Sequence, residues 1–290
     1  MTLSTIGRTP LRYTIAIIIA VVAVAVGVLA PRLAGASPKN LSAVDRVSAN
    51  PPPTLFTDAQ IASIAVPIER QDATASSLMK GWFTSHGAVR DDAAFVAWVE
   101  TQVPAPPAAA ARASELKKVQ GLAATRTPAG TAAATWLEVN GKKDIWKVYL
   151  HDQRELQDTK TGNAEKAQLK AMVKMAKTTS DDLAAKYRQS APYVLDPSLR
   201  TDHVVKKGTV CPCSYPSRHA ARSAAAAAYL GTLSPHRRSD YVWMRDQVAF
   251  SRVYMAGHVE SDITAGTLLG DMIADYFLVT SGVQPVSAPR

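Results

Sequence analysis

The chain has 290 residues, 47% of them hydrophobic, and carries a formal net charge of +9. This length can bury the core of one domain of about 200–250 residues, and the many alanines and few glycines favour helix over sheet. The charge suits anionic partners such as phosphate esters or acidic lipid headgroups, whereas the sequence has no dense basic run that would indicate nucleic acid as a partner.

The N-terminus carries one long apolar run, over residues 13–30. It is long for the core of a cleaved signal and just long enough to span a bilayer. Residues 34–36, Ala-Gly-Ala, have the small-x-small pattern of a signal peptidase site. We therefore expect residues 1–36 to be an export signal or a single-span anchor, which places the rest of the chain in the periplasm or outside the cell. No second run of this kind follows in the sequence, so a multi-span membrane protein is not expected.

Residues 37–57 contain serine, asparagine and three consecutive prolines, and are expected to form a linker. Thr57 then caps the first of a series of helices. Those expected before Pro192 cover residues 58–70, 76–85, 91–101, 108–124, 131–140, 144–152 and 163–189. The last is the cleanest amphipathic helix, or a pair of helices joined near residues 178–180, because apolar residues recur at helical spacing opposite lysines.

An irregular loop over residues 193–214 is long for an idle connection and is typical of a binding loop. Three further helices are expected at residues 218–230, 235–255 and 262–279. Ser234 before a proline starts the second of them, and Ser261 caps the third.

The expected fold is therefore all-α: a single helical bundle preceded by the hydrophobic signal or anchor helix. It lacks both a strand pattern long enough for a sheet and a fixed-period repeat. We divide it into an N-terminal helical part (58–130), a core that carries the candidate chemistry (131–282) and a short tail (283–290).

The chain has two cysteines, Cys211 and Cys213, separated by one proline in the predicted loop. A disulfide is permitted outside the cytoplasm, although closing a ring across one residue is strained. A metal site would need more soft ligands than this pair provides. A redox role and a bond to another partner are alternatives, and a structural role is favoured.

Two blocks of residues can carry chemistry. In the first, Pro216 and Ser217 form a turn that opens a helix, where unpaired N–H groups and the helix macrodipole attract anions. Ser217 can donate its hydroxyl and its backbone N–H, and His219 can protonate a leaving alkoxide. The alternative is that Ser217 is an ordinary N-cap and His219 an ordinary first-turn residue.

The second block contains Arg252, His258 and Asp262. Arg252 is a fixed positive charge with bidentate geometry for an oxyanion. Asp262 can hold one nitrogen of the His258 ring across a helix break, so that the other nitrogen attacks phosphorus. The alternative is a loop histidine, with Arg252 in an ion pair with Asp246 or Glu260.

Together the two blocks resemble the type 2 phosphatidic-acid-phosphatase superfamily, which includes bacterial nonspecific acid phosphatases, lipid phosphatases and vanadium haloperoxidases. That family carries Pro-Ser-Gly-His, and then Ser-Arg, five residues, His, three residues and Asp. Residues 251–262 match the latter motif at every defining position, and residues 216–219 match the former except that Arg218 replaces glycine. The resemblance covers roughly residues 130–282.

This resemblance implies a role for each residue. His258 would be the nucleophile that forms a phosphohistidine, Asp262 would orient it, and His219 would be the general acid. Arg252, the hydroxyl of Ser217 and the backbone N–H of residue 218 would bind the phosphoryl oxygens. No metal or organic cofactor is implied, and vanadate would bind only as a phosphate mimic.

The family's first motif, a lysine followed after six residues by Arg-Pro, is not matched. With its proline aligned to Pro192, alanines stand at both cationic positions, Ala184 and Ala191. Lys186 and Arg188 lie nearby, but two residues apart they point to different faces of a helix.

Arg218 is the second departure from the family pattern. It either blocks the site by its bulk or serves as a relocated phosphate-binding cation, and we favour the latter because both histidines are retained.

The expected function is an exported, metal-independent, acid-phosphatase-like enzyme that hydrolyses phosphomonoesters. Its substrate would be a phosphorylated small molecule or, in the alternative, a lipid phosphate, with attachment to the membrane by the single span. A vanadium haloperoxidase would use His258 to bind vanadate. A non-catalytic phosphate-binding relative is supported by the missing first-motif cations.

Overall fold

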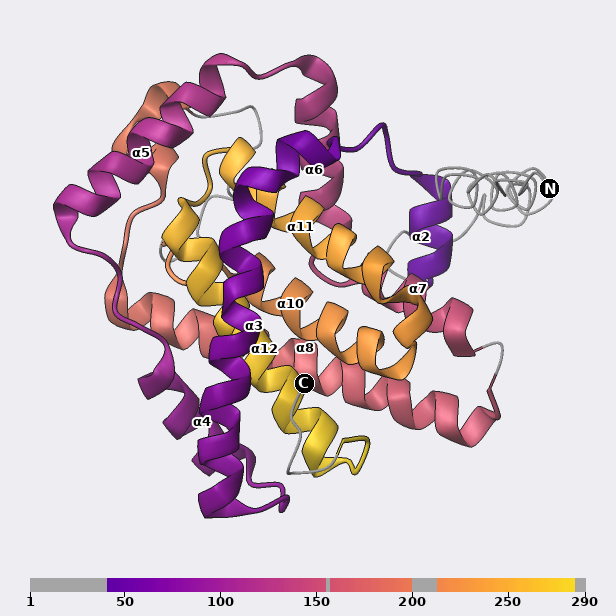
Figure 1. The fold of residues 1–290 in the computed structure, drawn as a ribbon. Helices are drawn as coiled ribbons and strands as arrows, with labels where there is room; N and C mark the ends of the chain where they lie inside the picture. The colour runs from indigo at the N-terminus through magenta and orange to yellow at the C-terminus, as the bar shows by residue number, and fades with distance from the viewer. Residues whose placement is uncertain (1–40, 155–156, 200–212, 285–290) are drawn as a thin grey trace, which may run out of the picture. The chain divides into compact units, whose positions relative to one another are not determined.

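The computed structural model describes residues 41–154, 157–199 and 213–284. In these residues the regular elements are helices, with one isolated bridge between Ser190 and Cys213 (Figure 1). The expected all-α fold is thereby confirmed. The predicted signal or anchor at residues 1–36 lies outside the described residues, as do Cys211 and most of the tail.

The chain divides into two compact units, Met1–Pro51 and Pro52–Arg290. The first contains α2 (Ala43–Ala49), within the segment predicted as a linker. Its capping box joins Ser42 and Asp45, and no residue of the helix is buried. Without an apolar stripe, this short helix had no periodic signal in the sequence.

The second unit holds the remaining helices. They are α3 (Asp58–His86), α4 (Asp92–Gln102), α5 (Ala109–Ala124), α6 (Pro128–Asn140), α7 (Asp144–Arg154), α8 (Thr159–Tyr187), α9 (Pro192–Leu195), η1 (Pro197–Leu199), α10 (Arg218–Leu233), η2 (Pro235–Arg237), α11 (Arg238–Tyr254) and α12 (Glu260–Thr280).

The helices predicted at 58–70 and 76–85 are one continuous helix, α3. Its buried residues include Ile68 and Ala75, and the helical period places Asp72 on the same face between them. There the Asp72 carboxylate lies 3.6 Å from the buried guanidinium of Arg245. Asp72 breaks the apolar pattern of the helix, and its partner Arg245 lies far away in the sequence. The two halves of α3 were therefore predicted as separate helices.

The chain around residues 178–214 also differs from expectation. α8 continues through the predicted join, where the buried Ser180 hydroxyl donates to the Ala176 carbonyl at 2.6 Å. The predicted loop begins with α9 and η1, and residues 200–212 lie outside the described part of the chain.

One predicted cap is confirmed in position and one is wrong. Ser234 is the N-cap before Pro235, but its side chain makes no capping hydrogen bond, and the first turn is the 3-10 helix η2, which precedes α11. Val259, rather than Ser261, precedes the first residue of α12. Ser261 lies in the first turn of α12, where N–H groups have no partner within the helix, and it donates its N–H and hydroxyl to Glu115 of α5.

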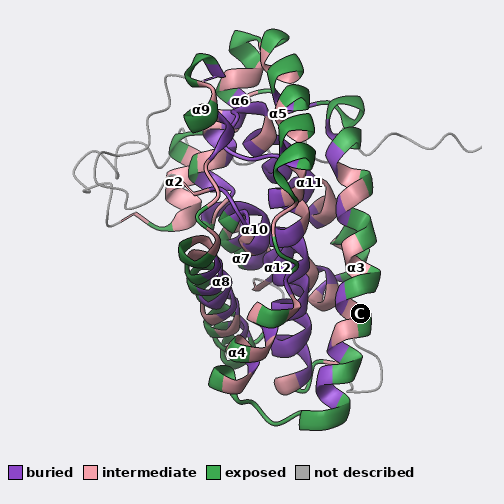
Figure 2. Ribbon diagram, turned by 90° about the vertical axis from the view of Figure 1, so that its left-hand side faces the viewer, coloured by how far each residue is buried: buried purple, intermediate pink, exposed green. Residues whose placement is uncertain are grey.

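α12 is the central helix of the second unit, and Figure 2 shows it buried along most of its length. It packs against α10, α3 and α8. Of the described helices, α12 alone is long and apolar enough to cross a bilayer, and 89% of its apolar window is buried inside the protein. A helix buried in the core of a protein can have the same length and apolar composition as a membrane span.

Glycines set the distance between α10 and α12. A Cβ at Gly266 would lie 2.4 Å from the carbonyl oxygen of Ser217, and one at Gly270 would lie 2.2 Å from that of Ala221. Residues without a side chain therefore allow the two backbones to approach closely. This contact brings the start of α10 beside the start of α12.

Candidate active site

Four of the predicted residues come from helix ends that meet in the second unit. His219 lies in the first turn of α10, Arg252 in the last turn of α11, His258 in the following turn and Asp262 in the first turn of α12. Each is less than 9% exposed. Burial lowers the pKa of both histidines, and the positive charge of Arg252 lowers it further.

The His258 ring is held through its Nδ1 atom. This nitrogen lies 2.8 Å from the carbonyl oxygen of Ser214 and 3.6 Å from Oδ2 of Asp262. Because a carbonyl only accepts hydrogen bonds, Nδ1 carries the proton and Nε2 keeps its lone pair. The main hydrogen bond that fixes the tautomer therefore comes from Ser214, and Asp262 adds a negative charge beside it.

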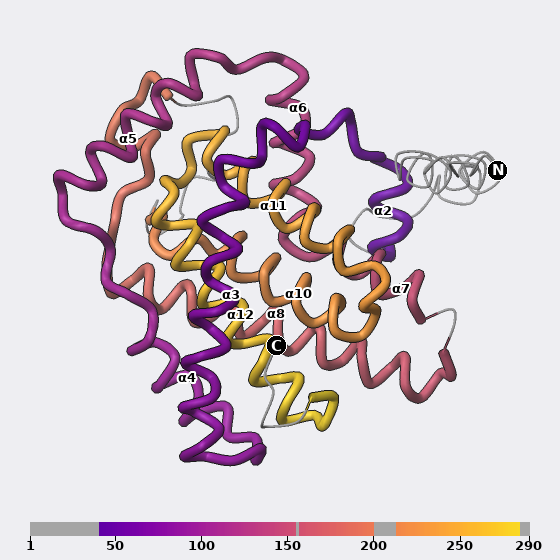
Figure 3. Tube along the Cα trace, in the orientation of Figure 1, coloured from indigo at the N-terminus to yellow at the C-terminus, as the bar shows by residue number. Residues whose placement is uncertain are grey.

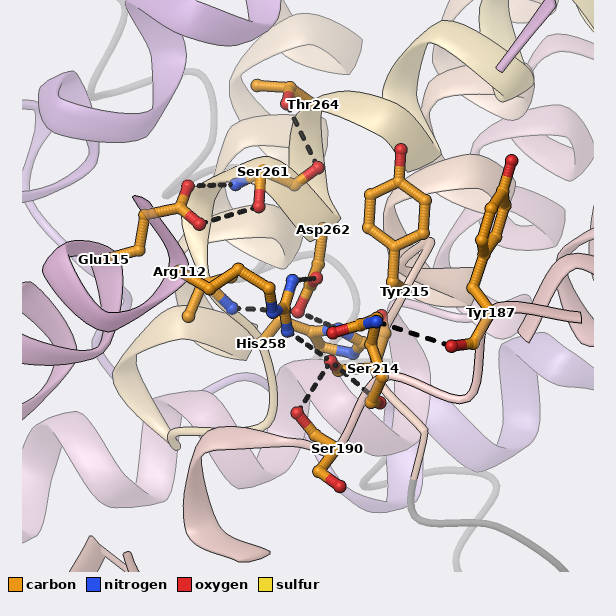
Figure 4. A network of polar contacts seen from close by, with 12 residues as sticks. Arg112, Glu115, Tyr187, Ser190, Ser214, Tyr215, His258, Ser261, Asp262 and Thr264 are labelled. Atoms are coloured by element: carbon orange, nitrogen blue, oxygen red, sulfur yellow. Dashed lines mark hydrogen bonds and ion pairs between the residues drawn. The ribbon is translucent and has the colours of Figure 1, made fainter. Parts of the chain in front are cut away.

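Asp262 is fully buried and bound on both oxygens (Figure 4). Oδ1 accepts a hydrogen bond from Nη1 of Arg112 at 2.8 Å, and Oδ2 accepts one from the backbone N–H of Val259 at 3.0 Å. Burial would raise the pKa of Asp262, but His258 and Arg112 hold that pKa below its usual range. The carboxylate is therefore ionised at neutral pH.

His219 is buried at the start of α10, and its Nε2 lies 3.4 Å from the carbonyl oxygen of Glu138. Burial lowers the pKa of His219 well below 6.5, and the charges of Arg252, His258, Arg218 and Lys142 lower it further. In the ligand-free protein this imidazole is neutral at neutral pH. A bound anion would raise its pKa.

Ser217 is the N-cap of α10, and its hydroxyl accepts a hydrogen bond from the N–H of Ala220. Its own N–H donates to the carbonyl of Asp262 at 2.8 Å, so it is not available to a phosphate in this arrangement. The hydroxyl hydrogen can still be donated to an anion.

The Arg218 side chain is 47% exposed and forms an ion pair with Asp181 of α8 at 3.0 Å. Its proposed role as a phosphate ligand stays a prediction.

Arg252 has a partner that no pattern in the sequence indicates. Its Nη1 lies 3.0 Å from Oε2 of Glu138 on α6. Of the partners considered, Asp246 pairs with Arg245 and Glu260 pairs with Lys118. Both alternatives for Arg252 are therefore wrong.

Lys142 follows one turn after Glu138, at the end of α6. Burial lowers the pKa of Lys142, Glu138 raises it, and the Lys142 charge in turn lowers the pKa of His219. Lys142 therefore adds a half-buried cation near the site. Neither Glu138 nor Lys142 lies in a motif, so the sequence offered no signal for them.

The cations near the missing first motif lie elsewhere. The amine of Lys186 stacks over the ring of Tyr187 at 5.2 Å, and both Lys186 and Arg188 are exposed. Arg188 ends α8 in the left-handed region, with φ 51°, and its Nε donates to the carbonyl of Ala185. Ala191 is buried before α9.

Comparison with known proteins finds a family whose profile matches the part of the chain that carries the site. Residues 169–282, from α8 to the end of α12, match the profile of the PAP2 superfamily. The chain is also similar to the crystal structure of a transmembrane PAP2-type phosphatidylglycerolphosphate phosphatase from Bacillus subtilis, with a TM-score of 0.45 and 15% identity over 66% of this chain and 93% of that one. No curated protein matches significantly. The matched region contains both motifs, with the buried residues Ser217, His219, Arg252, His258 and Asp262, and this region of the chain carries the PAP2 superfamily profile.

Proposed function

We propose that this protein is an exported phosphatase that hydrolyses phosphomonoesters through a phosphohistidine at His258, without a metal. The observation that carries the proposal is the hydrogen bond from Nδ1 of His258 to Ser214, which leaves Nε2 for attack beside Arg252 and His219. Export is supported by the apolar run at residues 13–30.

In the first step, Nε2 of His258 attacks phosphorus and the bond from phosphorus to the ester oxygen breaks. The departing alkoxide takes a proton from His219, whose pKa rises when the substrate dianion binds near it. In the second step, His219 removes a proton from water, and the resulting hydroxide displaces His258 from phosphorus. Phosphate leaves and both imidazoles return to their starting states.

Charge in the transition state would be stabilised by Arg252, by the Ser217 hydroxyl and by the N–H groups at the start of α10. One well-placed donor of this kind contributes about 3–4 kcal/mol. Lys142, a half-buried cation whose charge acts on His219, would offset the alanines at 184 and 191. Substrate oxygens would take the place that the Glu138 carboxylate occupies beside Arg252.

The test is hydrolysis of p-nitrophenyl phosphate by the full chain, purified in mild detergent, with EDTA present. We expect turnover by the wild type, loss of at least about 1,000-fold in His258→Ala, and normal activity in the control His236→Ala, whose side chain is exposed. His219→Ala should slow alkyl phosphates more than p-nitrophenyl phosphate, because p-nitrophenolate leaves without protonation. Inactivity of the wild type across substrates and pH would overturn the proposal.

The same preparation separates the alternatives. Selective turnover of a lipid phosphate in mixed micelles would make the protein a lipid phosphatase, and vanadate-dependent halide oxidation would make it a haloperoxidase. The alanines at 184 and 191 favour one further candidate, a non-catalytic phosphate-binding protein. Binding of inorganic phosphate in calorimetry without any hydrolysis would identify it.

A further inference from the structure

We propose that Arg112 of α5, which lies outside the region matched to the family, is a positioning residue that fixes the His258 ring through Asp262 and Ser214. The proposal rests on the proposed function, because the orientation of His258 matters for phosphoryl transfer only if His258 is the nucleophile.

The guanidinium of Arg112 binds both groups that contact Nδ1 of His258. Its Nη1 donates to Oδ1 of Asp262 at 2.8 Å, and its Nη2 donates to the hydroxyl of Ser214 at 3.2 Å. The Ser214 carbonyl and the other Asp262 oxygen face Nδ1. Figure 4 shows Arg112, Asp262 and Ser214 converging on His258. One side chain therefore binds both of the residues that contact Nδ1 of the proposed nucleophile.

The burial of these groups makes the arrangement specific. The side chains of Arg112 and Asp262 are 9% and 0% exposed. A buried carboxylate without a cation is costly, and removing one partner of such a pair is strongly destabilising. Only the planar fork of arginine can serve two acceptors in fixed directions, so lysine is not an equivalent replacement.

Arg112 is engaged on both terminal nitrogens with Asp262 and Ser214, so it acts through them rather than by touching the phosphate. This separates it from Arg252, which faces Glu138 at the site. Arg112 is accordingly a positioning residue, and its loss should change the orientation and protonation of His258 more than substrate affinity.

The rest of α5 supports the same segment (Figure 3). One turn after Arg112, Glu115 accepts two hydrogen bonds from Ser261, each 2.8 Å long. One turn further, Val119 packs in a buried cluster with Ala256 and Val259. Residues at positions i, i+3 and i+7 share one helix face. This face of α5, which we call the α5 brace (Arg112, Glu115 and Val119), therefore holds the chain on both sides of His258.

The decisive measurement is a proton NMR titration of the His258 ring in the full-length wild type, Arg112→Met and Arg112→Lys, with His258→Ala used for assignment. In Arg112→Met the Asp262 carboxylate loses its cation and is free to bind Nδ1, so the pKa of His258 should rise. Arg252 and His219 also face this ring, and the two Arg112 variants leave both residues unchanged. Lys118→Met, which removes an exposed ion pair one residue from the brace, should leave the pKa unchanged.

Activity supplies the second measurement. Arg112→Met should lower kcat about 100-fold, as expected for a misplaced reacting group, with KM changed little. Arg112→Lys should recover part of kcat. If Arg112→Met does not fold, as judged by circular dichroism, Arg112→Lys decides the question by the same two measurements.

An unchanged pKa of His258 and an unchanged kcat in a folded variant would overturn the proposal. A merely structural role would lower the unfolding temperature without moving that pKa, and would also overturn it. If the wild type shows no hydrolysis, the proposed function fails, and the NMR titration still decides whether Arg112 positions His258.

Discussion

Two regions supply the candidate site by different physical means. The first, the α10–α12 seam, is built from small residues and places His219 and Asp262 by close contact between two helix backbones. The second, the α5–α6 flank, contributes Arg112, Glu138 and Lys142 through long charged side chains. The seam lies within the region matched to the family, whereas the flank lies outside it.

The difference shows which properties belong to which region. Close packing fixes where the helix ends lie, because two helix backbones in direct contact cannot shift past each other without clashes. Charged contacts then shift the pKa values of the buried imidazoles, and Arg112 holds the two groups that contact Nδ1 of His258. Changes in the seam should therefore affect the free energy of unfolding, and changes in the flank should affect binding and protonation.

The largest effect is expected in the seam. In Gly270→Ala the new Cβ would lie 2.2 Å from the carbonyl oxygen of Ala221, so the helices must separate. We expect a loss of about 3 kcal/mol or more in the free energy of unfolding, measured by urea denaturation. The matched control is Gly81→Ala, on the exposed side of α3 with no atom within 4 Å of the new Cβ. It should gain about 0.5–1 kcal/mol. Equal changes in the two variants would show that the seam is not tight.

An intermediate effect is expected from pH, since burial in the seam lowers the pKa of His219, and the charges of Arg252 and of Lys142 in the flank lower it further. In the unfolded chain a histidine takes up its proton near pH 6.5, so below that pH the unfolded state binds more protons than the folded state. Stability should therefore fall as pH drops below about 6.5, by at most about 1.4 kcal/mol per pH unit for each such histidine.

The test is urea denaturation at pH 7.5, 6.5 and 5.5. His219→Asn should flatten the loss of stability on acidification, and the exposed control His236→Asn should not. An identical pH dependence in wild type and His219→Asn would contradict the lowered pKa of His219.

The smallest effect is expected from the ion pair between the flank and Arg252. Glu138→Gln removes a negative charge 3.0 Å from the Arg252 guanidinium, where a phosphate oxygen would bind. We expect inorganic phosphate to bind several-fold more tightly, a change of about 1 kcal/mol, as measured by calorimetry. Glu260→Gln removes the partner of the exposed Lys118 and serves as the control. Weaker phosphate binding in Glu138→Gln would show instead that Glu138 holds Arg252 in its binding position.

Local sequence signals predicted most of the helices. Thr57 starts α3 with a capping box, and Pro192 follows the end of α8, as their capping and chain-breaking properties indicate. Signals failed where a distant partner intervened. Asp72 interrupts the apolar stripe of α3, and its charge lies close to that of Arg245 on α11. Ser261 donates to Glu115 of α5 and does not cap α12.

The sequence by itself determined the helical class, the resemblance to the family and the motif residues His219, Arg252, His258 and Asp262, because spacing within a motif is a local property. Only the tertiary structure revealed that Arg112 lies behind Asp262, 150 positions away along the chain. A contact of that kind depends on how α5 packs against the start of α12, and no periodicity or capping preference in either helix encodes it.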